Sequence, residues 1–557
     1  MSPPPMMAAL NACCYSPRML ALDPTDDLAR PAFKDAASCT LWLGQLQLTN
    51  LNLALAALRK QLDEFNRCAL KGSDRLQTLE VLRETISLVQ ADTGRKLAGK
   101  KLPLSDDEFI LLLTISSLWQ SFLNGYLRCL QGAETGDKAL TGYIALLCQR
   151  AMHYSGLQIT NFLRAGCEPD AKSWQQFHAL YAHIEAIELH NEKVPDEYDY
   201  AGQPISASTL YASTLLMHRA RFLGLSRTQY RVVERWLNLW SDALTITPRC
   251  SVSKSDAPPL GIDLSSAHGL QSLQHAVDKD CMRFIAMVPL SKQIRVKTIL
   301  LQQGQLPQQA ALGNELSSKE CVTLLNKLHA CWCEAQADSL AETARKVPHV
   351  QLCIGLEKIY SQLAQKPFRP VKDKSTSQQD ARRQIETFGR VLDSTGQHAL
   401  QELGFVPEEW QVDQDDLITA RLLRTMSHGE RLGVNQLVSV FTPNNSQQHK
   451  LAWVHMISVT RSGYLYMGLN YLLGQPQPIS IRGDTSNESV QSGSAAALML
   501  PAFESAKLPA SLILPRDWFA TGRTLDLLLA NGSKQKVTLG FSVDKGSDFE
   551  RVSFTPL

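Results

Sequence analysis

LAWVHMISVTRSGYLYMGLNYLLG, residues 451–474, decides the fold of the C-terminal part of this chain. In residues 451–460 the side chains alternate between two faces, with Leu451, Trp453 and Ile457 on one of them. A period of two in a run rich in aromatic and β-branched residues is typical of a β-strand. Arg461-Ser462-Gly463 then predicts a short turn, and residues 464–473 predict a returning strand.

The residues before this stretch extend the pattern. Residues 432–441 predict one more strand, which ends at Pro443-Asn444-Asn445. Three consecutive strands joined by tight turns predict a meander, and therefore a small antiparallel barrel. Further strands are expected near the C-terminus, where Asn531-Gly532 between two alternating runs is a strong hairpin signal because both residues accept positive φ.

The N-terminal part carries the opposite signal, an apolar period of three to four residues that predicts helices, among them residues 270–286 and 350–363. Three of these segments begin with a capping box. In a capping box the serine hydroxyl accepts a hydrogen bond from the amide of the third helical residue, and the side chain of that residue accepts one from the serine amide. The serines are Ser105, paired with Glu108, then Ser226 with Gln229 and Ser317 with Glu320. The fold class expected is therefore multidomain α + β, with a large all-α N-terminal region before the barrel.

Changes in composition along the chain predict its division into segments. The prolines and serines of the first residues favour a flexible leader, and KPFRPVKDKSTSQQDA, residues 366–381, has the composition of a linker. The expected segments are a leader (1–40), a helical domain (41–250), a second helical subdomain (251–365), a linker (366–400), a β-barrel (401–484) and a β-rich C-terminal extension (485–557).

The totals exclude several classes of protein. The 557 residues include 56 basic and 54 acidic side chains, a formal net charge of +2, so neither DNA nor RNA is an expected partner. The N-terminus lacks a signal peptide, and no window approaches about 18 consecutive apolar residues, so no membrane span is expected. Without a signal peptide the cytoplasm is the expected compartment, and together with the odd count of 13 cysteines and the lack of C-x-x-C it favours reduced thiols.

The clusters of polar residues in the sequence match no metal-binding or catalytic motif. His178, His183 and His190 share one helical segment, but their spacings match no metal-binding helix motif, so a polar helix face is the favoured interpretation. His329 and Cys333 lie one helical turn apart, and two ligands do not make a zinc site. Adjacent Ser427 and His428 predict a turn rather than a catalytic triad. No nucleotide-binding or catalytic motif occurs, so neither an enzyme nor a metal site is expected.

The strands of the C-terminal part carry a family resemblance. GVNQLVSV (433–440), LAWVHMISVTRSGYLYMGLNYLLG (451–474) and PISIR (478–482) resemble bacterial PilZ-like domains, and especially the divergent kind at the C-terminus of long, otherwise helical chains. The resemblance covers less than a fifth of the chain. It implies a small six-stranded barrel, and many members of that family bind cyclic di-GMP.

The resemblance also implies where a ligand would bind. The family uses an R-x-x-x-R segment ahead of the barrel and a D/N-x-S-x-x-G motif on early strands. Here the arginines ahead of the barrel, including Arg390, lack that spacing, and the stretch that begins at Asp413 has Asp415 in place of serine and Ile418 in place of glycine. An acidic side chain at that place repels a phosphate.

Arg421 and Arg424 offer a substitute clamp for phosphate or guanine, and a solvated strand edge is the alternative. The expected ligand-binding residues are therefore Arg390, Asp413, Arg421 and Arg424.

Three hypotheses about function follow. The first is a non-enzymatic bacterial signalling or adaptor protein, linked to cyclic di-GMP, whose helical region binds a protein partner. The second is a structural protein–protein interaction scaffold that binds no nucleotide. The third is a metal-dependent enzyme that uses the helical histidines.

Overall fold

A computed structural model of the chain describes residues 20–26, 28–196, 203–249, 257–270, 280–334, 348–369, 405–442, 445–483, 493–503, 508–529 and 531–557. The chain forms two compact units. Unit 1 consists of residues 1–100, 104–341 and 459–461, and unit 2 of residues 101–103, 342–458 and 462–557.

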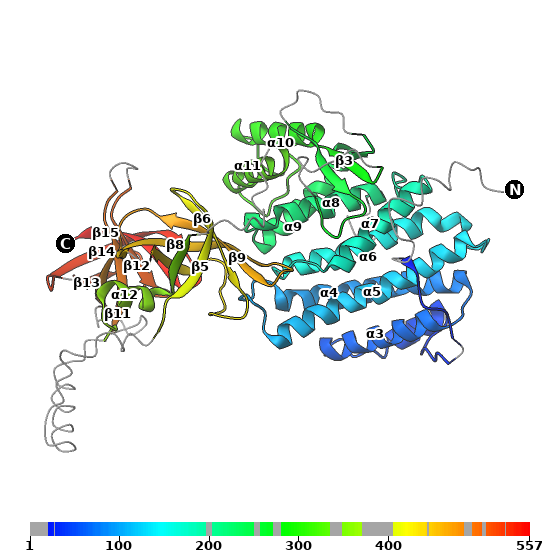
Figure 1. The fold of residues 1–557 in the computed structure, drawn as a ribbon, viewed down its shortest axis with the longest axis horizontal. Helices are drawn as coiled ribbons and strands as arrows, with labels where there is room; N and C mark the ends of the chain where they lie inside the picture. The colour runs from blue at the N-terminus through cyan, green and yellow to red at the C-terminus, as the bar shows by residue number, and fades with distance from the viewer. Residues whose placement is uncertain are drawn as a thin grey trace, which may run out of the picture. The chain divides into compact units, whose positions relative to one another are not determined.

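Unit 1 is built of helices, with α5 packed against α3, α4 and α6 (Figure 1). Ser105, Ser226 and Ser317 each form the expected capping box, which fixes where α5, α9 and α11 begin. The helices are α2 (Ala36–Leu43), α3 (Leu51–Arg67), α4 (Gly72–Leu97), α5 (Asp106–Glu134), α6 (Ile144–Arg164), α7 (Ala171–Ala186), α8 (Ala207–Arg219), α9 (Arg227–Leu239), α10 (Met287–Gln302) and α11 (Ser318–Cys333).

Unit 1 also contains a small sheet, which the all-α expectation missed. It is antiparallel, in the order β1-β3-β2, with β1 (Thr245–Thr247), β2 (Leu260–Asp263) and β3 (Met282–Ala286). The sequence predicted a helix over residues 270–286, and the end of that range is strand β3, while residues 271–279 lie outside the described part. Apolar runs this short do not distinguish a strand from a buried helix turn by their period.

Two closed barrels form most of unit 2, and the expected β-barrel is confirmed. The first has strands β4 (His349–Ile354), β5 (Glu408–Asp415), β6 (Thr419–Thr425), β7 (Leu437–Thr442), β8 (Asn445–Val459) and β9 (Tyr464–Leu472). The second has β10 (Gln477–Gly483), β11 (Ser494–Leu500), β12 (Ser511–Pro515), β13 (Thr524–Leu528), β14 (Lys534–Lys545) and β15 (Phe549–Pro556).

The two barrels share one strand order. Around the first the order is β4-β5-β6-β9-β8-β7, and around the second it is β10-β11-β12-β15-β14-β13. The meander expected from residues 432–473 is present as β7, β8 and β9, which are neighbours in that order. The PISIR strand, expected beside them, instead pairs with the second barrel, where Ile479 lies opposite Ala497 and Ile481 opposite Leu527. Alternation shows that a strand exists but not which strand it pairs with.

The segment before the expected linker also differs from the prediction. Residues 350–363 were expected to be helical, but they form strand β4 followed by helix α12 (Leu356–Ala364). Gly355 separates the two elements with a φ of 85°, a conformation that glycine adopts without strain. Residues 370–404 lie outside the described part, and the elements on either side of them, α12 and β5, both belong to unit 2.

Some of the residues expected to form a flexible leader are packed. Residues 1–19 lie outside the described part, but Ala29 and Phe33 are buried and α2 begins at Ala36. The Phe33 ring lies 5.4 Å from the ring of Phe65 on α3, measured between centroids. Packing against α3 therefore orders the chain ahead of α2.

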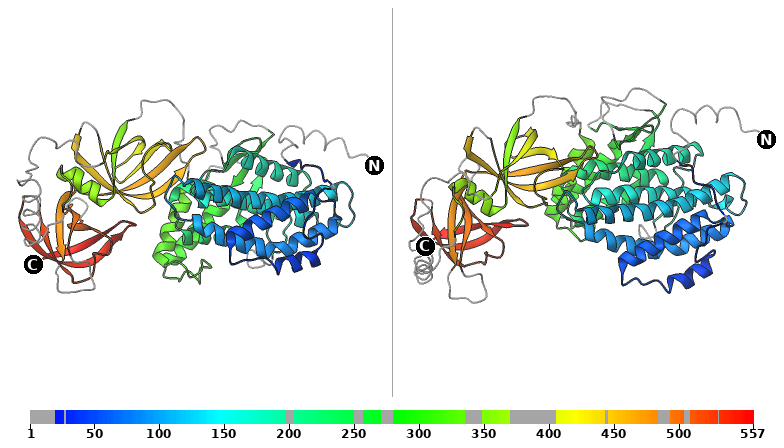
Figure 2. Two further views of the ribbon diagram at one scale, coloured as in Figure 1. Left: turned by 90° about the horizontal axis from the view of Figure 1, so that it is seen from below. Right: turned by 60° about the horizontal axis from the view of Figure 1, so that its bottom comes forward.

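Helix α12 packs against strands of both barrels (Figure 2). Its residues Leu356, Ile359 and Tyr360 belong to one apolar core with Leu437 of the first barrel and Phe549 of the second. Ile359 is fully buried there. The second barrel encloses a further core of its own, which includes Leu512, Leu525 and Val552. The shared core therefore makes the two barrels and α12 one packed body.

Helix α5 is the one described helix that is long and apolar enough to cross a membrane, judged by length and composition alone. Of its most apolar 18-residue window, 61% is buried inside the structure. The core helix of a folded domain has the same composition, so this helix is weak evidence for a membrane span.

Replacing Ile359 by alanine should lower the free energy of unfolding of unit 2 by about 2–5 kcal/mol, because it leaves a cavity in the core that α12 shares with both barrels. Urea-induced unfolding followed by circular dichroism measures the change. The control is Glu357→Ala on the exposed side of α12, which should cost about 1 kcal/mol or less. Equal stabilities for the two variants would show that α12 does not hold the barrels together.

Candidate functional site

A β-bulge in the first barrel brings Asp413 and Arg421 together. Val412 pairs with Leu422 and Gln414 with Arg421, so Asp413 is an extra residue on β5. The Asp413 Oδ2 atom lies 3.6 Å from Arg421 Nε. Arg421 also donates a hydrogen bond to Gln414, and the Tyr466 hydroxyl donates one to Asp413. These residues form a polar cluster on the outside of the barrel, because the alternate β6 residues Ala420 and Leu422 are buried.

A second group of charges lies at the adjacent end of β5. Lys450 Nζ is 3.0 Å from Asp415 Oδ2 and 4.8 Å from the ring centroid of Tyr471. The Tyr471 hydroxyl donates to Asp415 over 2.9 Å, and burial next to this carboxylate raises the pKa of Tyr471. The amide of Gln414 donates to Asp416. This outer face therefore carries three carboxylates, those of Asp413, Asp415 and Asp416, but only two cations, Arg421 and Lys450. An anionic ligand would have to displace the Asp413 carboxylate to reach Arg421.

Arg424 lies on the opposite face of β6 from Arg421. Its guanidinium carbon is 4.9 Å from the ring centroid of the buried Trp410, and its Nη2 donates to the carbonyl of Glu430 over 2.7 Å. Glu408 Oε2 lies 3.3 Å from Arg424 Nε. Burial lowers the pKa of Arg424, and the Glu408 carboxylate opposes that shift. Arg424 is thus engaged in internal contacts at one end of the barrel.

The structure brings together only some of the predicted ligand-binding residues. Asp413 and Arg421 are in contact, whereas Arg421 and Arg424 do not converge, because residues three apart on a strand point to opposite faces. Arg390 lies outside the described residues, as do Arg382 and Arg383. The ligand-binding role of these residues stays a prediction.

The helical histidines are engaged in internal contacts. Both ring nitrogens of His178 lie close to oxygen atoms, with Nδ1 at 2.5 Å from the Tyr211 hydroxyl and Nε2 at 2.6 Å from the carbonyl of His268. Complete burial lowers the pKa of His178 to about 4. His183 Nε2 lies 2.6 Å from Glu134. No group of three or more metal-ligating side chains is arranged around a common point in the described part of the chain.

The two other pairs considered in the sequence, His329 with Cys333 and Ser427 with His428, lie in different parts of the chain. His329 Nε2 lies 2.9 Å from the Ser291 hydroxyl, and burial raises the pKa of the Cys333 thiol to about 12. A protonated thiol is a poor metal ligand. Ser427 and His428 contact each other in the exposed turn that follows β6.

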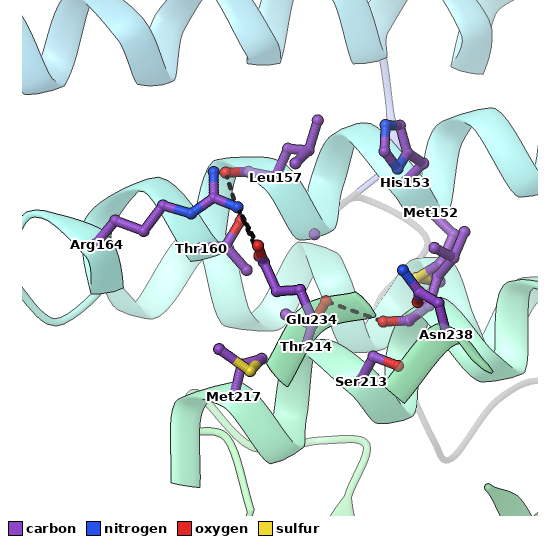
Figure 3. Close-up of a pocket in the computed structure, with 12 residues that line it drawn as sticks. Met152, His153, Leu157, Thr160, Arg164, Ser213, Thr214, Met217, Glu234 and Asn238 are labelled. Carbon is purple, nitrogen blue, oxygen red and sulfur yellow. Dashed lines mark hydrogen bonds and ion pairs between the residues drawn. The ribbon is translucent and has the colours of Figure 1, made fainter. Parts of the chain in front are cut away.

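A small pocket between α6, α8 and α9 was not predicted from the sequence (Figure 3). Its volume is about 190 Å³, and Met152, His153, Ser213 and Met217 are among the lining residues. Arg164 reaches its edge, where Nη2 donates to both carboxylate oxygens of Glu234 over 2.6 and 2.7 Å. This volume is below the range of about 300–1,000 Å³ that is usual for small-molecule sites.

A buried ion network ties α4 and α6 to the segment after α7. The Asp196 carboxylate is fully buried and receives Arg83 Nη2 at 2.6 Å and Arg150 Nη1 at 2.7 Å. Glu80, which is partly exposed, lies 3.3 Å from each of the two arginines, and the Tyr154 hydroxyl accepts from Arg83 Nε. Such a network holds elements in register. Charged residues on amphipathic helices usually face solvent, so no sequence signal indicated these partners.

Comparison with known proteins relates both ends of the chain to one kind of protein. A family model described as the N-terminal domain of the cyclic-di-GMP receptor FimW matches residues 37–249, and the model of the FimW C-terminal β-barrel domain matches residues 484–557. The cyclic-di-GMP receptor FimW of Pseudomonas aeruginosa is 23% identical over 599 aligned positions, which cover 97% of this chain and 95% of that protein.

These similarities confirm the resemblance to divergent, long PilZ-like proteins that the strand sequences indicated. No solved structure gives a significant match.

Replacing Arg424 by alanine should lower the free energy of unfolding by about 3 kcal/mol, because it leaves the carboxylate of Glu408 without its nearest cation and removes the stack on Trp410. Arg421→Ala, on the outer face, should cost about 1 kcal/mol or less. Thermal unfolding of the two variants measures the difference. Similar losses would contradict the placement of the two arginines on opposite faces.

Unit 1 should lose stability in acid through His178. Its pKa in the folded chain, about 4, lies below its ordinary value of 6.5, so the stability is fully present above pH 6.5 and is lost as the pH falls towards 4. The loss amounts to about 3 kcal/mol at 1.36 kcal/mol per pKa unit. Urea unfolding of the wild type and of His178→Gln between pH 7 and pH 4 measures it, and the variant should show the flatter dependence. Parallel curves would contradict this assignment.

Proposed function

We propose that this chain, a divergent PilZ-like protein with a helical N-terminal region, is a non-enzymatic signalling protein that acts as a receptor for cyclic di-GMP. The observation that carries the proposal is the extent of the similarity to a cyclic-di-GMP receptor, which includes the helical region as well as the barrels. A shared barrel alone would support only a shared fold.

The same proposal assigns roles to the two units. The helical region binds a protein partner, and the barrel unit acts with it as an adaptor in the cytoplasm, without nucleic acid or membrane as partners. Support comes from the near balance of 56 basic and 54 acidic side chains and from the helices that make up most of unit 1. A scaffold that binds no nucleotide is the alternative, and it is supported by the acidic surroundings of Arg421.

Arg421 is the arginine of the first barrel that we propose for ligand contact. It is partly exposed, and its guanidinium can donate two parallel hydrogen bonds to a phosphate or to O6 and N7 of guanine. Binding would release Arg421 from Asp413 and from the side-chain oxygen of Gln414, and the Tyr466 hydroxyl, which already donates to Asp413, would keep holding that carboxylate. We propose Arg421 rather than Arg424 for this contact, because the guanidinium of Arg424 is buried against Trp410.

Isothermal titration calorimetry of the full chain with cyclic di-GMP tests this function. The wild type should bind, and Arg421→Ala should weaken binding about tenfold, the effect of one charge-assisted hydrogen bond. Arg516→Ala removes an exposed arginine of the second barrel and should leave the affinity unchanged.

If the wild type releases heat on titration and Arg421→Ala binds cyclic di-GMP equally well, the ligand binds at another site. No heat at high micromolar ligand would refute the receptor and favour the scaffold.

A further inference from the structure

The start of helix α5 exposes apolar side chains to solvent. Phe109, Ile110 and Leu113 are 45%, 60% and 46% exposed. Single exposed apolar residues are common, but several together on one helix face mark a surface that binds another protein. Asp106 lies one helical turn before Ile110, is exposed and makes no ion pair with any residue that the structure describes. Its charge suits the positive end of the helix dipole, which does not account for the apolar residues beside it.

Helix α10 exposes apolar side chains next to the opposite charge. Val296 and Ile299 are each 50% exposed. The helix contains Lys292, Arg295 and Lys297 and no acidic residue. Lys292 lies one helical turn before Val296, is exposed and has no ionic partner in the described part of the chain. The exposed face of α10 is therefore both apolar and basic.

The two exposed faces have the same spacing. On each helix a charged residue is followed by apolar residues at positions i+4 and i+7, which places all three in one stripe along the helix. The α5 stripe consists of Asp106, Ile110 and Leu113, and the α10 stripe of Lys292, Val296 and Ile299. Apolar residues at this spacing pack between neighbouring helices as knobs into holes.

The opposite charges make the α5 stripe complementary to the α10 stripe. If the two helices pack side by side in parallel, the acidic end of one stripe lies beside the basic end of the other, and the apolar residues cover each other. Two α5 stripes, or two α10 stripes, would instead bring like charges together in that arrangement.

Within one chain the two stripes are not covered. Helix α10 packs against α11, whereas α5 packs against α3, α4 and α6 (Figure 1). The apolar residues of both stripes are about half exposed in the single chain. Each stripe can therefore receive the complementary stripe only from a second copy.

We propose that the helical unit binds a second copy of this chain, with the α5 stripe of one copy packed against the α10 stripe of the other. Asp106 then pairs with Lys292, and the apolar residues of both stripes become buried. This self-association goes beyond the proposed receptor function, and it requires no nucleotide.

Sedimentation velocity of the full chain at low ionic strength, between about 1 and 100 µM, tests the association. The wild type should shift from one chain to at least two as the concentration rises. Ile110→Glu and Ile299→Glu each place a charge in the apolar contact and should raise the Kd of association about tenfold or more. The matched control is Leu53→Glu on α3, which changes an exposed leucine outside both stripes and should leave the Kd unchanged.

An exchange of charges distinguishes a direct contact from a loss of folding. Asp106→Lys and Lys292→Glu should each weaken the association, because like charges then meet in every pair of identical copies. An equimolar mixture of these two variants should associate as the wild type does, because every contact between different copies again joins opposite charges. A structural role of either residue would not produce this recovery.

Three results would overturn the proposal. The first is a wild type that stays monomeric over the whole concentration range. The second is an association that Ile110→Glu and Ile299→Glu leave unchanged. The third is a mixture of Asp106→Lys and Lys292→Glu that associates no better than either variant alone. Because the samples contain no nucleotide, none of these results depends on the receptor function.

Discussion

The packing of α12 against two barrels at once is the constraint on which unit 2 depends. A barrel ordinarily buries its inner face and exposes its outer face. Here Ile513 and Phe549 of the second barrel join Leu437 of the first in the core around Ile359, so parts of the barrels that would otherwise face water are buried. Strand β12 is buried at four successive positions for this reason. Since these surfaces are occupied, a ligand of unit 2 has to bind elsewhere, and the outer face with Arg421 is available.

The repeated strand order gives the two barrels one architecture with different surfaces. Around the bulge of β5 the first barrel carries an exposed cluster of charges, whereas the strands β11 and β12 of the second carry apolar side chains that pack on α12. The bulge of β5 places the extra residue, Asp413, next to Arg421, beyond Trp410, the buried residue of that strand.

Sequence predicts those parts of the structure that local chemistry decides. The capping boxes at Ser105, Ser226 and Ser317 fix three helix starts, and the alternation in residues 451–473 fixes two strands. Pairing is not a local property, which is why β10 could not be assigned to the second barrel. Strand β4 is not distinguishable from a helix in the sequence, because HVQLCI is short and runs directly into the helix after Gly355.

The candidate site residues likewise divide into features that local sequence predicts and features that depend on the fold. The opposite orientations of Arg421 and Arg424 follow from their spacing once the residues are known to form a strand. The contact of Asp413 with Arg421 depends on a bulge that no residue pattern announces.

We propose that cyclic di-GMP contacts this chain through Arg421 while the core around α12 stays unchanged. Hydrogen–deuterium exchange of the full chain, with and without cyclic di-GMP, tests it most directly. Bound cyclic di-GMP should slow exchange along β5 and β6 and leave exchange in α12, β10 and β11 unchanged. Exchange that slows nowhere, or only in α12 and the second barrel, would contradict it.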